Sequence, residues 1–223
     1  MELKYIIFDM DGVILDSKDS ILDATEHTLA CFGRVLTPED ADRIVGPPLR
    51  KIYEEIFGFS PETAAEAIGI YKKRYAEVSY RLAKPFDGVV EMLKELTAHG
   101  KKLMIATARY SDTAEFMLEH AGVRQFFCYV GSLYLHPDGT DGGLKTKADV
   151  IRDVLTKNDI FDTECAVMVG DRAEDILGGR ENHLLTLGAL YGFGSREELL
   201  GAGADHLADS PLAVSRYIIE NYE

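Results

Sequence analysis

Apolar and polar positions follow two different periods along the chain, and the changes of period divide it into parts. Tyr5–Phe8 is an unbroken apolar run, too short for a helix and rich in strand formers, which is typical of a buried strand in a parallel sheet. Over residues 17–84 apolar positions recur at helical spacing, and from residue 85 strand and helix patterns alternate. We therefore predict an α/β domain of residues 1–16 and 85–223, interrupted by a helical domain of residues 17–84.

The inserted domain is expected to be a small helical bundle. Thr37-Pro38 is typical of a helix start, and Gly46-Pro47-Pro48 indicates where that short helix ends. A longer helix is predicted from Ser60-Pro61 to about residue 79. The chain crosses between the domains at Asp16-Ser17 and Lys84-Pro85, which we expect to act as hinges. The insertion would then close over the strand ends as a cap that excludes water and selects substrates.

The α/β domain is expected to form a Rossmann-like parallel sheet covered by helices. After the first strand, further strands are predicted at 103–106, 128–131, 166–169 and 184–187, with a weak strand near residue 206. Helices are predicted at 89–99, 113–121 and 148–158, after the capping pair Ser195 and Glu198, and at the end of the chain.

Two carboxylates follow the first strand directly. Asp9 lies at its carboxyl end, Asp11 follows two residues later, and Gly12 permits a sharp turn. Ligands of open α/β sheets bind beyond the carboxyl ends of the strands, so both side chains should project into the site. Two carboxylates 4 Å apart repel by roughly 4 kcal/mol at an effective dielectric constant of about 20. The pair therefore needs a cation, and oxygen ligands favour Mg²⁺ over zinc or copper.

Polar residues also end later strands. Thr107 follows the strand at 103–106, and Asp171 follows the strand at 166–169. Asp175 lies one helical turn beyond Asp171, a spacing at which like charges destabilise a helix unless a cation bridges them. Lys147 falls on the apolar face of its predicted helix and should be buried, whereas Lys145 should point the other way. A lysine in the first turn opposes the helix dipole, so helix stability does not explain its presence.

Composition and charge limit the possible partners. The 223 residues carry a net charge of −14, which argues against nucleic acid or an anionic membrane as a partner. No apolar run approaches the ~20 residues that a membrane span needs, and no targeting segment is visible. The three cysteines are widely spaced and are expected to be reduced thiols in the core. We expect a soluble, unprocessed, cytoplasmic protein.

The chain resembles the haloacid dehalogenase superfamily throughout its length. The likeness is carried by Asp9-Met-Asp11-Gly-Val-Ile-Leu-Asp16-Ser17, Thr107, Lys147 and Gly170-Asp171-Arg-Ala-Glu-Asp175. Four motifs in the right order are far more specific than one Asp-x-Asp. The helical insertion resembles the C1-type cap of that superfamily. Three segments are similar to phosphoglycolate-phosphatase-like hydrolases, namely Val45-Gly-Pro-Pro-Leu49, Lys147-Ala-Asp-Val-Ile151 and Tyr191-Gly-Phe-Gly-Ser195.

This resemblance implies a Mg²⁺-dependent phosphatase for a small phosphorylated metabolite, such as phosphoglycolate, a nucleotide or a sugar phosphate. It implies that Asp9 is the nucleophile that forms an aspartyl phosphate and that Asp11 is the general acid and base. Mg²⁺ would be held by the carboxylates of Asp9 and Asp171 and the backbone carbonyl of Asp11. Asp175 would be a further ligand or a support for the others.

The phosphoryl oxygens would be bound by Thr107, the backbone amide of Ala108 and Lys147. The family often has Asn or Ser at position 108, so Ala108 keeps only its backbone donor, and the next residue, Arg109, is a candidate substrate contact. His183 lies where the family usually has glycine, which bears on how the preceding helix ends.

Several alternatives stay open at this point. A phosphomutase similar to β-phosphoglucomutase would move phosphate between sugar hydroxyls without releasing it. A non-catalytic relative would bind Mg²⁺ and phosphate without turnover. Arg50 could reach a substrate from the cap, although an exposed helix arginine is the more usual explanation. The sequence decides neither the physiological phosphate ester nor between a monomer and a homodimer.

Overall fold

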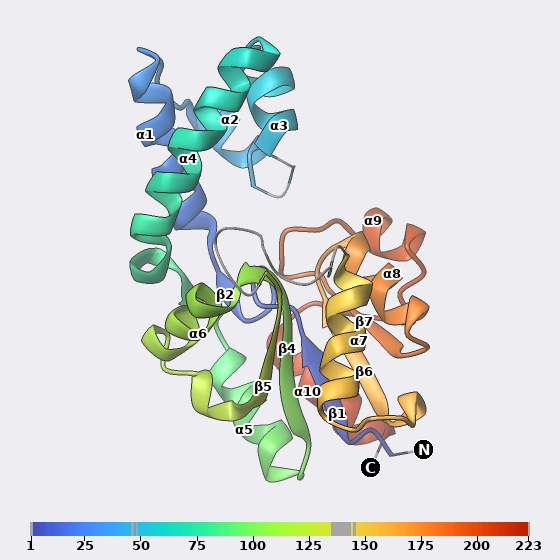
Figure 1. Cartoon of the computed structure of the whole chain (residues 1–223). Coiled ribbons are helices and arrows are strands. Elements are labelled where there is room, and N and C mark those ends of the chain that lie inside the picture. The colour runs from blue at the N-terminus through green and yellow to red at the C-terminus, as the bar shows by residue number, and fades with distance from the viewer. Residues whose placement is uncertain (1, 46, 48, 135–143, 145, 223) are drawn as a thin grey trace. The chain divides into compact units, whose positions relative to one another are not determined.

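The computed structural model describes residues 2–45, 47, 49–134, 144 and 146–222, and it divides the chain into two compact units (Figure 1). The larger unit comprises Met1–Asp16 and Pro85–Glu223, and the smaller one comprises Ser17–Lys84. Two short strands that the sequence pattern did not predict, β2 (Leu15–Asp16) and β3 (Lys84–Pro85), pair with each other where the chain passes between the units. Gly46 and Pro48 of the predicted turn, and Lys145, lie outside the described residues.

The larger unit is built on a six-stranded sheet in the order β5-β4-β1-β6-β7-β8, in which all paired strands are parallel. The strands are β1 (Tyr5–Phe8), β4 (Lys102–Tyr110), β5 (Phe127–Tyr134), β6 (Ala166–Gly170), β7 (Leu185–Ala189) and β8 (His206–Ala208). In the register of the central strands, Phe8 lies opposite Ile105 of β4 and Val169 of β6. The carboxyl ends of these three strands are therefore neighbours. The predicted Rossmann-like parallel sheet is confirmed.

Helices cover both faces of this sheet. They are α5 (Val89–Ala98), α6 (Ser111–His120), α7 (Lys147–Lys157), α8 (Ala173–Glu181), α9 (Arg196–Gly201) and α10 (Pro211–Asn221). In Figure 1, α7 lies in front of the sheet and α10 behind it. Val150 and Val154 of α7 pack with Ile7, Met104 and Met168 of three adjacent strands in one fully buried cluster. This packing fixes α7 over the strands that lead to the site.

Apart from its share of β3, the regular elements in the described residues of the smaller unit are helices. Its elements are α1 (Lys18–Cys31), α2 (Pro38–Arg43), α3 (Leu49–Lys51), a π-helical turn (Ile52–Ile56) and α4 (Pro61–Leu82). Tyr53, Phe59 and Tyr71 form its aromatic core. Arg74 of α4 donates two hydrogen bonds to Asp23 of α1, at 2.6 and 3.0 Å. No helix in the described part of the chain combines the length and apolar character needed to cross a membrane.

The structure corrects two local predictions, on the end of β4 and on the cysteines, and it explains the conformation at His183. The strand predicted to stop before Thr107 continues to Tyr110, with a shift in its pairing to β5 between these residues, as expected for a β-bulge near the end of a strand. The cysteines do not lie in the core: Cys31 and Cys128 are exposed and Cys165 is partly exposed. His183 has a φ of 59°, the left-handed conformation in which glycine is the usual residue after a helix.

Candidate active site

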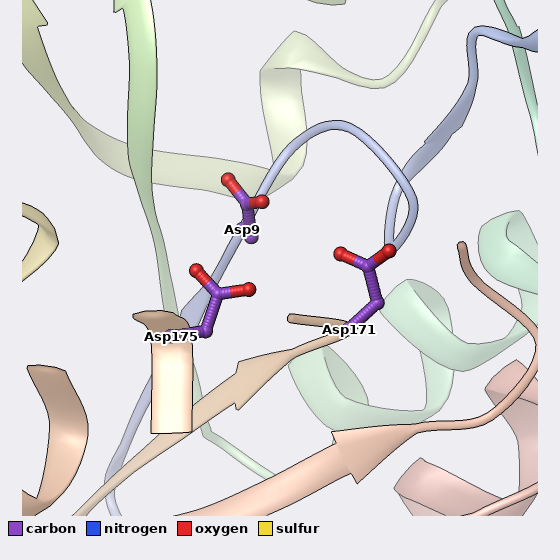
Figure 2. A group of neighbouring side chains, drawn as sticks. All are labelled: Asp9, Asp171 and Asp175. Atoms are coloured by element: carbon purple, nitrogen blue, oxygen red, sulfur yellow. The ribbon is translucent and has the colours of Figure 1, made fainter. Parts of the chain in front are cut away.

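Three aspartates meet at the carboxyl ends of the central strands. Asp9 follows β1, Asp171 follows β6, and Asp175 lies in the first turn of α8. One carboxylate oxygen from each of them lies within 4.8 Å of the others. Figure 2 shows the three carboxylates facing a common space. Asp171 and Asp175 are fully buried and Asp9 is only 9% exposed, so water screens their mutual repulsion poorly.

Asp171 and Asp175 lie close together for a different reason from the predicted one. The sequence suggested that both lie on one helix, a turn apart. In the structure α8 begins at Ala173, so Asp171 precedes the helix. The carboxylate of Asp175 turns back and accepts a hydrogen bond from the backbone N–H of Arg172 at 3.1 Å. The two side chains therefore meet because a tight turn connects β6 to α8.

Glycines allow the backbone to approach these carboxylates closely. A Cβ atom on Gly170 would lie 2.1 Å from Cβ of Asp175, and one on Gly12 would lie 2.1 Å from Oδ2 of Asp171. Gly12 also has a φ of +80°, which side chains disfavour. Any larger residue at either position would displace an aspartate of the cluster.

We therefore expect Gly170→Ala to disturb the site directly. Its methyl group would have to displace Cβ of Asp175, and overpacking of this kind typically costs about 1–3 kcal/mol. Urea unfolding and an activity assay would measure the effects on stability and on the site. Gly201→Ala is a matched control because a Cβ there meets no atom within 4 Å. Equal behaviour of the two variants would contradict the close packing at Gly170.

A buried lysine joins two of the aspartates. Lys147 is the first residue of α7, which Thr146 and Asp149 start with a reciprocal capping box. Its Nζ lies 2.8 Å from Oδ1 of Asp9, 2.9 Å from Oδ1 of Asp175 and 3.0 Å from the carbonyl oxygen of Ala106. Burial lowers the pKa of Lys147, but attraction to Asp175 and Asp9 outweighs it and raises the pKa above its ordinary value. The side chain is therefore a permanent ammonium.

The cluster has the donors and the charge expected of a divalent cation site. When all three carboxylates are ionised, they and the one ammonium leave two negative charges uncompensated among these four side chains. Oδ2 of Asp171 accepts the backbone N–H of Phe193 at 2.8 Å, whereas its buried Oδ1 has no hydrogen-bond partner among the described residues. A buried carboxylate oxygen without a partner is costly unless a cation binds it. The donor set thus fits Mg²⁺.

These charges predict an unusual pH dependence of stability in the metal-free protein. Burial, and then repulsion from Asp175, raises the pKa of Asp171 from 3.8 to about 7, and burial also raises the pKa of Asp9. Between these pH values the folded protein holds protons that the unfolded chain has released. The proton bound to Asp171 in the folded state therefore contributes stability at about pH 4. This stability is lost as the pH rises through about 7, by up to about 1.4 kcal/mol per pH unit for each proton.

The comparison of wild type with Asp171→Asn isolates this effect. Urea unfolding with a chelator should show that the wild type loses stability relative to the variant between pH 4.5 and 7.5. Added Mg²⁺ should flatten the wild-type curve, because a bound cation favours the ionised carboxylates. A stability difference independent of pH would contradict the raised pKa of Asp171.

Asp11 lies beside the cluster but has a different partner. Its carboxylate accepts two hydrogen bonds from the guanidinium of Arg109, from Nε to Oδ2 at 2.5 Å and from Nη2 to Oδ1 at 2.6 Å. The backbone N–H of Arg109 donates to Oγ1 of Thr107 at 3.2 Å. Thr107 is buried and Ala108 is exposed, both on the last part of β4. Hydrogen bonds thus link Asp11, Arg109 and Thr107, with Ala108 between the last two in the chain, whereas Asp9, Asp171, Asp175 and Lys147 form the acidic cluster.

Arg50 belongs to the smaller unit, where its side chain is 70% exposed and forms an ion pair with Glu54 at 3.6 Å. This contact between neighbouring turns is the ordinary behaviour of a surface arginine. Its contact with a substrate stays a prediction.

The loop after β7, for which no role was predicted from the sequence, holds Asp171 in place. Besides the Phe193 N–H, the loop presents Gly192 and Gly194, at which a Cβ would lie 2.4 Å from Cβ of Asp171 and 1.8 Å from its carbonyl oxygen. The hydroxyl of Tyr191 donates to the carbonyl of Val13 at 3.2 Å, which ties the loop to the turn after β1. In the sequence, the only indication of this role was the pair Gly192 and Gly194, which are separated by one residue outside the predicted helices.

Comparisons with known proteins agree with this geometry. The family model described as haloacid dehalogenase-like hydrolase matches residues 6–189. A 5'-nucleotidase of Pseudomonas aeruginosa is 31% identical over 97% of this chain and 96% of its own. A phosphoglycolate phosphatase of Vibrio vulnificus is 27% identical over 94% of this chain and 93% of its own. The crystal structure of a predicted phosphatase from Clostridium acetobutylicum is 32% identical, with a TM-score of 0.82 and coverage of 99% and 100% of the two chains.

Proposed function

The chain belongs to the haloacid dehalogenase-like hydrolases, and we propose that it is a Mg²⁺-dependent phosphatase that hydrolyses a small phosphorylated metabolite through an aspartyl phosphate on Asp9. The two relatives described above are named for a nucleotide and for phosphoglycolate, both small phosphate monoesters. The observation that carries the proposal is the convergence of Asp9, Asp171 and Asp175 with Lys147 at the end of the central strands.

Asp9, Asp171 and Asp175 are the residues that we propose to hold Mg²⁺, together with the backbone carbonyl of Asp11. When bound, the ion would offset negative charge on the cluster and on the transferring phosphoryl group. The partnerless Oδ1 of Asp171 and the two uncompensated charges support this assignment. The smaller unit, Ser17–Lys84, is proposed to be the cap that selects the substrate.

The first step is phosphoryl transfer to Asp9. Both described hydrogen bonds to its carboxylate reach Oδ1, from Lys147 Nζ at 2.8 Å and from the Met10 backbone N–H at 2.7 Å. We assign Oδ2 as the attacking atom, because the other oxygen is held by these donors. A bond forms between Oδ2 and phosphorus while the bond from phosphorus to the ester oxygen breaks. Asp11 supplies the proton that turns the leaving alkoxide into an alcohol.

The second step returns the enzyme to its starting state. Asp11 takes a proton from a water molecule, whose oxygen attacks the phosphorus of the aspartyl phosphate. Inorganic phosphate leaves and the Asp9 carboxylate is restored. In both steps Thr107 and the Ala108 N–H would donate hydrogen bonds to the phosphoryl oxygens, where charge is greatest in the transition state. The Lys147 ammonium, whose three N–H groups reach Asp9, Asp175 and Ala106, would offset that charge.

A substrate panel with and without Mg²⁺ tests the proposal. We expect phosphate release from at least one member of a set that includes phosphoglycolate, nucleoside monophosphates and sugar phosphates. Activity should be lost when a chelator removes the metal. Release of no phosphate from any ester at saturating Mg²⁺ would contradict a phosphatase, and conversion of one sugar phosphate into its isomer would indicate a mutase.

A further inference from the structure

Arg109 and Asp11 form a shielded ion pair at the edge of the acidic cluster. Both oxygens of the carboxylate accept a hydrogen bond from the same guanidinium, in the two-pronged geometry that is strongest for this pair. The side chains are 14% and 27% exposed, so the pair is screened less than an ordinary surface salt bridge. Arg109 is thus fixed on Asp11 in this structure.

This arrangement conflicts with the role of Asp11 in the proposed function, on which the inference rests. A carboxylate with both oxygens held by guanidinium N–H groups is not placed to exchange a proton with a leaving group or a water molecule. The pair must therefore open before either chemical step. Another acceptor should then replace Asp11, because breaking two charge-assisted hydrogen bonds at a largely buried site is costly unless new ones form.

The phosphoryl group of the substrate is suited to be that acceptor. Arg109 follows Thr107 and Ala108, the proposed phosphoryl donors, and its backbone N–H is bound to Oγ1 of Thr107. On the other side of the same segment, the carbonyl of Ala106 holds Lys147. Guanidinium binds phosphate in the same two-pronged manner as carboxylate, and a phosphate dianion carries more charge than one carboxylate.

We propose that Arg109 exchanges Asp11 for the phosphoryl group when the substrate binds. Without substrate, Arg109 holds the carboxylate of Asp11 in a position that is not productive. With a phosphoryl group between Thr107 and Lys147, the guanidinium moves onto its oxygens, and the released carboxylate of Asp11 takes up from solvent the proton that it then gives to the leaving group. The exchange makes Asp11 available only when there is a phosphoryl group to act on.

A double-mutant cycle on the binding of inorganic phosphate, with Mg²⁺ present, tests the exchange without turnover. We expect Asp11→Asn to tighten phosphate binding about tenfold, because no ion pair needs to open. In the Arg109→Ala background the same substitution should change binding less than about twofold. An equal effect of Asp11→Asn in both backgrounds would overturn the exchange, as would a failure of phosphate to bind. Either result can occur in an active phosphatase, so the proposed function is judged separately.

Steady-state kinetics separate the exchange from a fixed positioning role. If Arg109 moves onto the phosphoryl group, Arg109→Ala should raise KM about tenfold for both an alkyl phosphate and p-nitrophenyl phosphate, with little change in kcat. If Arg109 instead only positions Asp11, kcat should fall with little change in KM, and it should fall more for the alkyl phosphate, since its poor leaving group needs the proton. The second result would overturn the proposal.

Two further variants serve as controls for these kinetics. Arg109→Lys keeps the charge without the two-pronged geometry and should lie between wild type and Arg109→Ala. Arg152→Ala removes one positive charge from an exposed side chain on α7 and should leave KM unchanged. An equal rise in KM for Arg152→Ala would show that net charge, rather than the exchange, causes the effect.

Discussion

Asp9→Asn is expected to reduce phosphate release by at least about 10⁴-fold, the scale on which the loss of a nucleophile acts. The amide cannot form the acyl phosphate, although its oxygen can still accept the hydrogen bonds from Lys147 and the Met10 N–H. The variant should remain folded, because it removes one of three mutually repelling buried charges. Steady-state phosphate release with saturating Mg²⁺ measures the effect.

The covalent intermediate provides an independent check on Asp9. Acid quenching during turnover, followed by peptide mass spectrometry, should find a phosphate on the peptide containing Asp9 in the wild type. That phosphate should be missing in the variant. Asp87→Asn, at an exposed position of the same unit, should keep full activity. Activity of Asp9→Asn above about a hundredth of wild type would exclude Asp9 as the nucleophile.

The sequence was sufficient to predict the larger unit because its strands are buried on both faces. Such strands appear as short apolar runs, and the residue after each run is then placed at the carboxyl edge of the sheet. Asp9 and Asp171 were located in this way, and the parallel pairing of β1 with β6 brings them together. The burial of Lys147 followed from helical phase alone.

Features that depend on the shape of the backbone were not predictable from this pattern. The turn from β6 to α8 makes Asp171 and Asp175 neighbours. Their spacing in the sequence had instead predicted two positions one turn apart on the same helix. The pairing of β4 with β5 is irregular between Thr107 and Tyr110, the stretch that contains Arg109, the partner of Asp11. Such irregularities at strand ends depend on hydrogen bonds between distant segments, which leave no period in the sequence.

Charge balance explains why these irregular parts lie at the site. The acidic cluster is stable only while the lysine, a metal or protons offset its repulsion, and its aspartates are packed closely against neighbouring backbone. The glycines at positions 12, 170, 192 and 194 allow this close packing at the cluster. The same segments therefore determine both the stability of the metal-free protein and its capacity to bind a cation.

Lys147→Met is the most direct test of this balance. The substitution removes the ammonium that lies 2.8 Å from Asp9 and 2.9 Å from Asp175, and methionine fills a similar volume. Breaking a buried ion pair by removing one partner typically costs about 3–5 kcal/mol. We expect a loss of this size at pH 8 without metal, and a smaller loss at pH 5, where raised pKa values keep Asp9 and Asp171 partly protonated.

Urea unfolding at both pH values, with a chelator and with Mg²⁺, measures this loss, and Mg²⁺ should restore part of it. The substitution should also lower kcat by roughly 10²–10³-fold, since the positive charge beside the phosphoryl oxygens is missing. Lys157→Met, at an exposed position in the last turn of the same helix, should cost less than about 1 kcal/mol. A loss for Lys147→Met that is equally large at both pH values would show that packing, rather than charge, keeps this lysine in the site.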